Sequence, residues 1–495
     1  MVFFELPVFG GLPLIVLWLM VGALFMTVWL RFQPITGLRT STTVLRGKVT
    51  RKTDPGEVSS FQALATELSG TVGLGNIAGV AVAMSLGGPG AALWIVAFGL
   101  LGMSVKMAEA TLGSKFRQVK EDGTVQGGPM HYLRDGLASI GYRRTGVVLG
   151  GMYAAFTVFG AFGDDFFQTN QVAAIVADSS GSAFLQDNNW VIGAGIAVLV
   201  GIVIIGGVTS IARWTSKITP PMALVYTLCV IVVIVVNVDA VPGALAAMVS
   251  GVFTGEGVTG GVVGVAIIGI ERPVLQRAGV GTAGMAHAAS KTKHPATEGF
   301  TAMWEPVVDS VVVCMLTATA IVVAGAHESG SGDTTDGVTL TAAAFETVAG
   351  WFPLLLTVVV ALFGYSTLLA YAYYGEQALA YPLGDRRIVR YTFRAAWRSW
   401  ASRRGRGECA SQRWIARHRL RHRWGWPGLS PCPFVQFAGV SGWYGRLRPR
   451  RRCPRLRSAS CRWRSDPRGW SRFPSAFPCA PPPALCAGRW GPRPH

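Results

Sequence analysis

Long apolar stretches alternate with short polar connections over residues 1–385. A helix needs about 20 consecutive apolar residues to cross the hydrocarbon core of a bilayer. Nine stretches approach that length, at residues 9–32, 61–86, 90–112, 146–177, 190–212, 220–238, 261–288, 302–326 and 351–375. The first lacks the basic leader and the small-residue cleavage site of a signal peptide, so we count it as a span. The pattern predicts an all-α polytopic membrane protein with about nine spans.

The connections between these stretches alternate in charge. Every odd-numbered connection carries Lys or Arg, for example Arg213 and Lys217 after the fifth stretch. Every even-numbered connection lacks both and, where it is charged, carries Asp or Glu. Because Lys and Arg concentrate on the cytoplasmic side of membrane proteins, the alternation predicts a multi-pass protein of the cell membrane whose N-terminus lies outside.

The composition agrees with a membrane protein and separates two parts of the chain. Charged residues make up 14% of the chain, against about 25% in soluble domains, and the mean hydropathy is +0.39. The net charge of +19 is the sum of a negative charge on the first part of the chain and a large positive charge on the second. Residues 1–385 hold 19 basic and 24 acidic residues, whereas residues 386–495 hold 26 Arg, no Lys and 2 acidic residues.

Residues 386–495 are rich in Arg, Pro, Trp and Cys and contain no apolar stretch long enough to cross a membrane. This composition without Lys is typical of a shifted reading frame in GC-rich DNA, so we expect a disordered, frameshifted tail. We predict that a one- or two-nucleotide shift near residues 382–394 restores a frame encoding two further spans. The alternative is a selected basic tail that binds anionic lipid or nucleic acid. The absence of Lys and of a recognised binding module argues against a specific nucleic-acid partner.

A glycine-rich segment, residues 69–80, lies in the middle of the second apolar stretch and contains four Gly. Each Gly in a helix costs about 1 kcal/mol relative to Ala. In a membrane, a broken helix is tolerated where its backbone lines a binding cavity, with free carbonyls for a cation and a half-helix N-terminus for a carboxylate. Close helix packing through small residues is the alternative. The break itself carries no acidic residue, which favours sodium over a proton.

The same segment, Ser-Gly-Thr-Val-Gly-Leu-Gly-Asn-Ile-Ala-Gly-Val, resembles the signature helix of the sodium:alanine symporter family, the alanine or glycine:cation symporters. The likeness covers about residues 1–385 and continues, in order, at residues 87–94, 106–112, 127–130, 286–293, 305–309 and 373–376. It implies a leucine-transporter-like fold of two inverted five-helix repeats preceded by one extra N-terminal helix. The family pattern continues for two more spans where this chain has its Arg-rich tail. The resemblance therefore also implies a core that lacks its last two spans.

The resemblance further assigns a substrate site and a sodium site. The residues expected to bind substrate are Gly73, Gly75, Asn76, Ile77, Gln168, Thr367, Leu368 and Tyr371. The residues expected to coordinate sodium are Thr71 and Val72, mainly through their carbonyls, and Ser366. Two alternatives stay open: the amide in the fourth span forms an interhelical hydrogen bond without a ligand, and the hydroxyls of the ninth span bond to carbonyls of their own helix.

Four other polar residues within apolar stretches are expected to be structural. Lys106 and Glu109 are three positions apart and are expected to pair on one helical face. Asp309 is expected to be a buried counter-charge or a member of a polar network. His287 is expected to be structural rather than a proton carrier.

These features predict a sodium-coupled secondary transporter that imports a small neutral amino acid, such as alanine or glycine, by alternating access. We expect no enzyme, because the sequence shows no nucleophile triad, metal-ligand cluster or phosphate loop. We expect no cofactor, since sodium would be a co-transported ligand. The expected partners are the amino acid, sodium and the lipid bilayer, and the pattern indicates no oligomeric state. The alternatives are an inactive truncated symporter and a membrane anchor for the basic tail.

Overall fold

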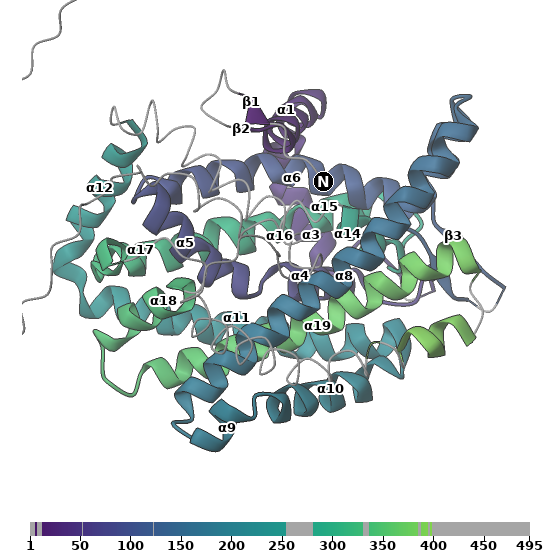
Figure 1. The fold of residues 1–495 in the computed structure, drawn as a ribbon. Helices are drawn as coiled ribbons and strands as arrows, with labels where there is room; N and C mark the ends of the chain where they lie inside the picture. Colours follow the sequence, from purple (N-terminus) through teal and green to yellow (C-terminus); the bar gives the residue numbers. More distant parts are fainter. Residues whose placement is uncertain are drawn as a thin grey trace, which may run out of the picture. The chain divides into compact units, whose positions relative to one another are not determined.

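The computed structural model describes residues 5–6, 12–51, 53–121, 123–253, 281–329, 336–384, 388–394 and 397. All of them belong to one unit of the chain, residues 1–426, and most of them are helical (Figure 1). Most of the predicted seventh span and most of the Arg-rich tail lie outside the described residues.

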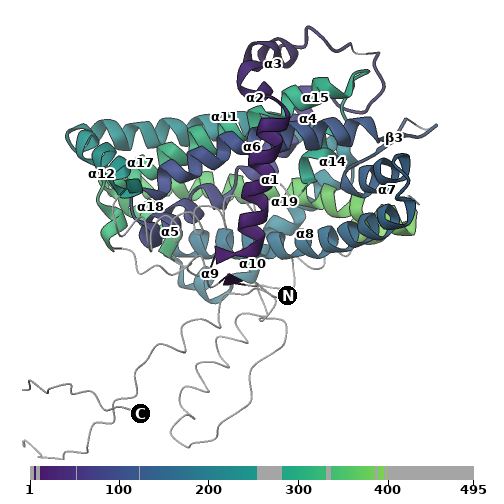
Figure 2. The ribbon, with the colours of Figure 1, turned by 90° about the horizontal axis from the view of Figure 1, so that it is seen from above.

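Among the described residues, the N-terminal part of the chain contains eight α-helices, one 3-10 turn and two short strand pairs. The helical segments are α1 (Leu14–Trp29), α2 (Gln33–Thr36), α3 (Leu38–Leu45), α4 (Ser60–Thr71), η2 (Leu74–Asn76), α5 (Ala78–Gly87), α6 (Ala91–Lys115), α7 (Pro129–Ser139) and α8 (Arg143–Ser179). The antiparallel strand pairs are β1 (Glu5–Leu6) with β2 (Leu12–Pro13) and β3 (Gln118–Val119) with β4 (Val125–Gln126). Figure 2 shows α1 crossing α6, against which it packs.

The C-terminal part alternates long helices with short connecting turns. Its segments are α9 (Ala183–Asp187), α10 (Trp190–Ile204), α11 (Gly207–Val236), η3 (Val238–Ala240), α12 (Val241–Phe253), α14 (Thr282–Ala288), α15 (Pro295–Ala302), α16 (Trp304–Pro306), η6 (Val307–Cys314), α17 (Met315–Val323), η7 (Ala326–Ser329), α18 (Asp336–Glu346) and α19 (Pro353–Leu383). Segment η6 is π-helical. A π-helical segment inside a helix often marks a functional position.

The longest helices surround the interrupted second span. α19 packs along α8 (Figure 1), and α11 packs against both α19 and α4. α19 also contacts α4 and η2 directly. The break between α4 and α5 therefore lies next to α19, the helix that carries the predicted hydroxyl residues.

The outward faces of several helices are apolar, as lipid contact requires. Leu199 and Ile202 on α10, and Leu228 and Val235 on α11, each expose more than half of their surface. An apolar surface of this extent is typical of a membrane-facing region. Among the described residues, five helices are long and apolar enough to cross a bilayer, and three shorter apolar helices accompany them. The protein is therefore an all-α, multi-pass membrane protein, and the count of nine spans stays a prediction.

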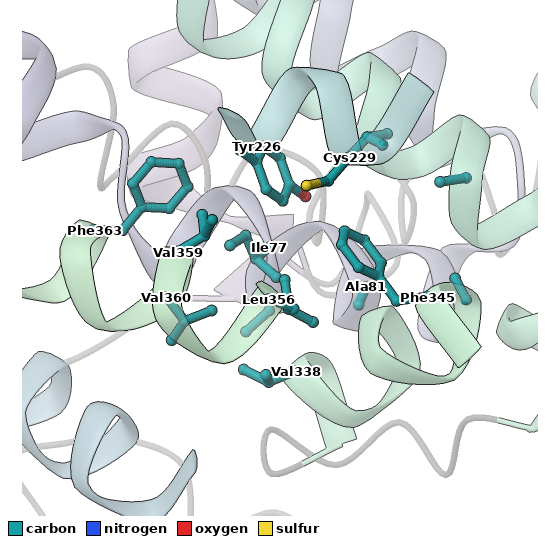
Figure 3. Close-up of a cluster of buried hydrophobic side chains, with 14 of the residues drawn as sticks. Ile77, Ala81, Tyr226, Cys229, Val338, Phe345, Leu356, Val359, Val360 and Phe363 are labelled. Atoms are coloured by element: carbon teal, nitrogen blue, oxygen red, sulfur yellow. The ribbon is translucent and has the colours of Figure 1, made fainter. Parts of the chain in front are cut away.

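A buried apolar cluster holds the segment around the break in place (Figure 3). Ile77, immediately after η2, packs with Tyr226 of α11 and Phe363 of α19, and all three are almost fully buried. The hydroxyls of Tyr226 and Thr317 share a hydrogen bond of 2.7 Å. Because this packing comes from three separate helices, it fixes the break relative to α11 and α19.

Helical structure continues beyond the predicted core boundary at residue 385. Residues 388–394 are helical, and Phe393 and Trp397 are 3% exposed against the cluster formed by α8 and α19. The Arg394 guanidinium donates hydrogen bonds of 2.8 and 2.7 Å to the Glu376 carboxylate. These residues therefore pack as a continuation of the core.

Candidate functional site

The second span is interrupted where the glycine-rich segment predicted a break. α4 ends at Thr71, Val72 has an extended backbone (φ −78°, ψ 93°), and a single 3-10 turn, η2, precedes α5. Gly73 is also extended, with φ −143° and ψ −158°. The predicted helix break is therefore confirmed.

The break leaves backbone groups unpaired on both of its sides. Among the described residues, no donor reaches the carbonyl oxygens of Thr71 and Val72, and no acceptor meets the N–H groups of Leu74 and Gly75. Buried backbone groups are nearly always hydrogen-bonded in native structures, because leaving one unpaired is costly. Free carbonyls followed by free N–H groups provide a cation-binding edge and an anion-binding edge within one short segment.

Gly73 brings two predicted substrate residues together. A Cβ atom on Gly73 would lie 2.9 Å from Thr367 Oγ1 and 3.5 Å from Gln168 Nε2. Gln168 is fully buried, and neither atom of its amide forms a well-aligned hydrogen bond in the described part of the chain, while Asp164, one turn earlier on the same helix, lies within reach. Within the described residues, Gln168 therefore forms no well-aligned hydrogen bond to another helix. Polar side chains of α8 and α19 therefore meet the backbone of the break at Gly73.

Gly70 has different neighbours from Gly73. A Cβ atom on Gly70 would lie 3.2 Å from Ala370 Cβ and 3.3 Å from Tyr374 Cε2. These are close contacts between α4 and α19, so the small-residue packing alternative applies at Gly70. A Cβ atom on Gly70 would also lie 3.5 Å from the Tyr374 hydroxyl, so its surroundings are mainly but not entirely apolar.

The predicted hydroxyl ligands donate to carbonyls of their own helices. Ser366 Oγ and Thr367 Oγ1 each donate to Phe363 O over 2.9 Å, and Thr71 Oγ1 donates to Glu67 O over 3.3 Å. A hydroxyl that donates its proton keeps oxygen lone pairs for another partner. The observed hydrogen bonds therefore orient these oxygens and leave them able to coordinate a cation, and the sodium role of Thr71, Val72 and Ser366 stays a prediction.

Asn76 is held by an acid on another helix. Its Nδ2 atom donates to Asp309 Oδ1 over 2.6 Å, and both residues are fully buried. The interpretation of Asp309 as a member of a buried polar network is confirmed. This contact ties the break to the π-helical segment η6.

The remaining predicted substrate residues differ in their surroundings. Ile77 lies in the apolar cluster of Figure 3, and its carbonyl accepts a 3.5 Å hydrogen bond from Thr341. Leu368 is 2% exposed in the cluster between α8 and α19, and the Tyr371 ring meets the Tyr374 ring edge-on at 5.6 Å. Gly75 lies within η2. The structure thus groups Gly73, Gln168 and Thr367 directly, and the ligand roles of the others stay predictions.

A buried charge network lies next to α4, and the sequence analysis missed most of it. Lys106 Nζ lies 2.8 Å from Glu67 Oε1 and 3.2 Å from Glu305 Oε2. His287 bridges two carboxylates, with Nε2 2.9 Å from Glu67 and Nδ1 2.7 Å from Glu298. Lys106 and Glu109 attract each other, but among the described residues the close ion pairs of Lys106 are with Glu67 and Glu305 on other helices. The structural role expected for His287 agrees with its position between two acids.

A signal for this network was present in the sequence. Glu67 lies within the second apolar stretch, one helical turn before Thr71. Ionisable residues within membrane spans are costly and face the protein interior, where they pair with one another. Glu67 is therefore a sequence signal for a buried ion pair beside the Gly-rich segment.

Comparison with known proteins decides the family. The model of the sodium:alanine symporter family matches residues 5–401. The chain belongs to this family. Members of the sodium:alanine symporter family are transporters rather than enzymes, and sodium is their co-transported ion rather than a cofactor. The family match extends past the boundary predicted at residue 385.

Three relatives illustrate the range of names within the sodium:alanine symporter family. The chain is 36% identical over 397 residues to the sodium/alanine symporter AgcS of Methanococcus maripaludis, covering 79% of the chain and 86% of that relative. It is 33% identical to the putative sodium/proton-dependent alanine carrier protein YrbD of Bacillus subtilis, covering 67% and 68%. It is 30% identical to the probable sodium/glutamine symporter GlnT of Bacillus subtilis, covering 76% of each. These comparisons support a sodium-coupled amino-acid symporter.

Proposed function

We propose that the chain imports a small neutral amino acid, alanine or glycine, together with sodium by alternating access, in a cell membrane with its N-terminus outside. The observation that carries this proposal is the Gln168 amide, which is fully buried beside Gly73 and Thr367 and forms no well-aligned hydrogen bond among the described residues. Leaving a buried polar group unpaired costs about 1–3 kcal/mol. A ligand with a donor and an acceptor would remove that cost.

The backbone and side-chain groups around the break fit the zwitterion of an amino acid. The N–H groups of Leu74 and Gly75 would bind the substrate carboxylate, since the N-terminus of a half-helix favours an anion. Gln168 Oε1 and Thr367 Oγ1 would accept hydrogen bonds from the substrate ammonium group. Each charged end of the substrate would then meet groups of matching chemistry.

The apolar neighbours of these groups favour a small side chain. Val172 follows Gln168 by one helical turn, Phe363 precedes Thr367 by one turn, and both are buried in the same apolar cluster. A methyl group, or a hydrogen atom in glycine, needs no polar partner there. The glutamine named for one relative would need partners for its side-chain amide, which favours alanine or glycine for this chain.

Sodium would bind on the α4 side of the break. The carbonyl oxygens of Thr71 and Val72 are unpaired among the described residues, and Ser366 Oγ donates to its own helix, which leaves its lone pairs available. Several neutral oxygens suit a monovalent hard cation, because they replace its hydration shell without adding a second charge. Binding of both ligands at one break would couple their movement.

The test is uptake of radiolabelled alanine into proteoliposomes that contain the purified full chain. An inward sodium gradient is expected to drive uptake, and an equal potassium gradient is expected to drive none. Gln168→Leu is expected to abolish sodium-driven uptake while keeping or raising thermal stability, because an unpaired buried amide is replaced by an apolar group. Asn170→Leu is the matched control: Asn170 is exposed on the same helix, and its replacement should leave uptake unchanged.

Two outcomes would overturn this proposal. Equal uptake in potassium would contradict sodium coupling, and full activity of Gln168→Leu would contradict the placement of the substrate. Sodium-dependent alanine binding without any uptake would identify the chain as an inactive truncated symporter with an intact site.

A further inference from the structure

Buried carboxyl groups outnumber the cations available to them near α4. Glu67, Lys106, His287, Glu298 and Glu305 are all 0% exposed and form one group with contributions from α4, α6, α14, α15 and α16. Lys106 is the one ammonium group among them, and it stands between two carboxyl groups. One ammonium neutralises one carboxylate.

Glu67 and Glu305 do not share Lys106 equally. The Lys106 ammonium donates a hydrogen bond to Glu67 Oε1 over 2.8 Å. It also lies 3.2 Å from Glu305 Oε2, a longer and less well-aligned contact, and Glu305 Oε1 has no hydrogen-bond partner among the described residues. The second oxygen of Glu67, Oε2, shares a hydrogen bond of 2.9 Å with His287 Nε2. Glu305 is thus the carboxyl group of this network that Lys106 contacts less closely, and no second donor supports it among the described residues.

The other groups that face Glu305 do not favour a negative charge on it. They are Glu67 on α4, Asp309 on η6 and Tyr374 on α19, in addition to Lys106 on α6. Two of these four are acids and one is an uncharged hydroxyl whose oxygen is itself unpaired in the described residues. A buried carboxylate that shares its one cation with a better-placed acid and has acids among its other neighbours becomes neutral by taking up a proton.

We propose that Glu305 binds a proton in this conformation, which gives the chain a proton site separate from the sodium site at the break. Asp309 follows Glu305 on the same helical run and accepts the hydrogen bond from Asn76 at the break. The proton site is therefore one side chain away from the residues that surround the ligand. The proposal rests on the charge network alone and does not depend on alanine transport.

The test is infrared difference spectroscopy of the full chain in lipid, following the carbonyl stretch of protonated carboxylic acids across a pH titration. Wild-type protein is expected to show this band at neutral pH. In Glu305→Gln the intensity of the band is expected to fall by the contribution of one carboxyl group. Glu121→Gln is the matched control, because Glu121 is exposed and should contribute nothing to the band at neutral pH. A wild-type spectrum without the band at neutral pH, or an unchanged band in Glu305→Gln, would overturn the proposal.

Thermal unfolding is a second measurement, and it stays informative if the Glu305→Gln variant folds poorly. Gln is nearly isosteric with a protonated Glu, so Glu305→Gln should keep the unfolding temperature of the wild type at neutral pH. If Glu305 were instead ionised and paired with Lys106, the same change would break a buried ion pair and lower the unfolding temperature by many degrees. Loss of folding in Glu305→Gln would therefore contradict the proposal as well.

Discussion

Replacing Gly73 by Ala adds one methyl group at the point where three helices meet. The Cβ atom would lie 2.9 Å from Thr367 Oγ1 and 3.5 Å from Gln168 Nε2. Because an ordinary contact of this kind is about 3.4 Å or more, the Thr367 side chain must move by roughly 0.5 Å. Gly73 has an extended backbone that Ala also adopts, so added volume is the only perturbation. Overpacking of this size costs about 1–3 kcal/mol.

The assay is equilibrium binding of labelled alanine to purified protein in sodium. If the methyl group occupies space meant for substrate, the overpacking cost appears as a 5- to 150-fold rise in Kd, since about 1.4 kcal/mol corresponds to a factor of ten. Gly79→Ala is the matched control, because a Cβ atom on Gly79 meets nothing within 4 Å and Ala favours the helix there. Equal alanine affinity in the two variants would refute the placement of the site at Gly73.

Three further predictions concern stability and the C-terminal region. The Arg117 guanidinium donates to four backbone carbonyls near the ends of α4 and α14, so Arg117→Ala should lower the free energy of unfolding by about 3 kcal/mol in a thermal-denaturation assay, and Arg117→Lys by less. Burial lowers the pKa of His131 on α7, outside the spans, to about 4. The unfolded chain therefore takes up the proton first below about pH 6.5, and the free energy of unfolding should fall by about 3 kcal/mol between pH 6.5 and pH 4, a fall that His131→Asn should remove. Resequencing of the gene should reveal a one- or two-nucleotide shift that restores two apolar spans; because Trp397 packs on the core and the family match reaches residue 401, we place that shift after codon 397, and an intact frame would contradict it.

The position of the break could be predicted because glycine acts locally. Several Gly within one apolar stretch weaken the helix wherever the chain is placed, and the break formed at Val72 and Gly73. The polar residues that meet there were found through their resemblance to a family pattern, and the structure brings Gly73, Gln168 and Thr367 together. Spacing alone would have given neither the partner helices nor the empty hydrogen-bonding capacity of Gln168.

The rest could not be predicted because it depends on distant contacts. Lys106 has an acid three positions away, yet it pairs with Glu67, 39 residues earlier, and with Glu305. Gln168 and Asn170 are the same kind of side chain two positions apart, but a step of two residues turns an α-helix by about 200°. Gln168 is therefore buried while Asn170 is exposed. Local spacing fixes which residues share a face, and the packing of other helices decides which face is inside.

The most direct test of a shared alanine and sodium site is their linkage in binding. Alanine affinity should be measured by equilibrium dialysis over a series of sodium concentrations, and sodium affinity over a series of alanine concentrations. If both ligands bind at the break, sodium should lower the Kd for alanine by some factor, and alanine should lower the Kd for sodium by the same factor. Alanine binding that is unchanged when potassium replaces sodium would contradict the account.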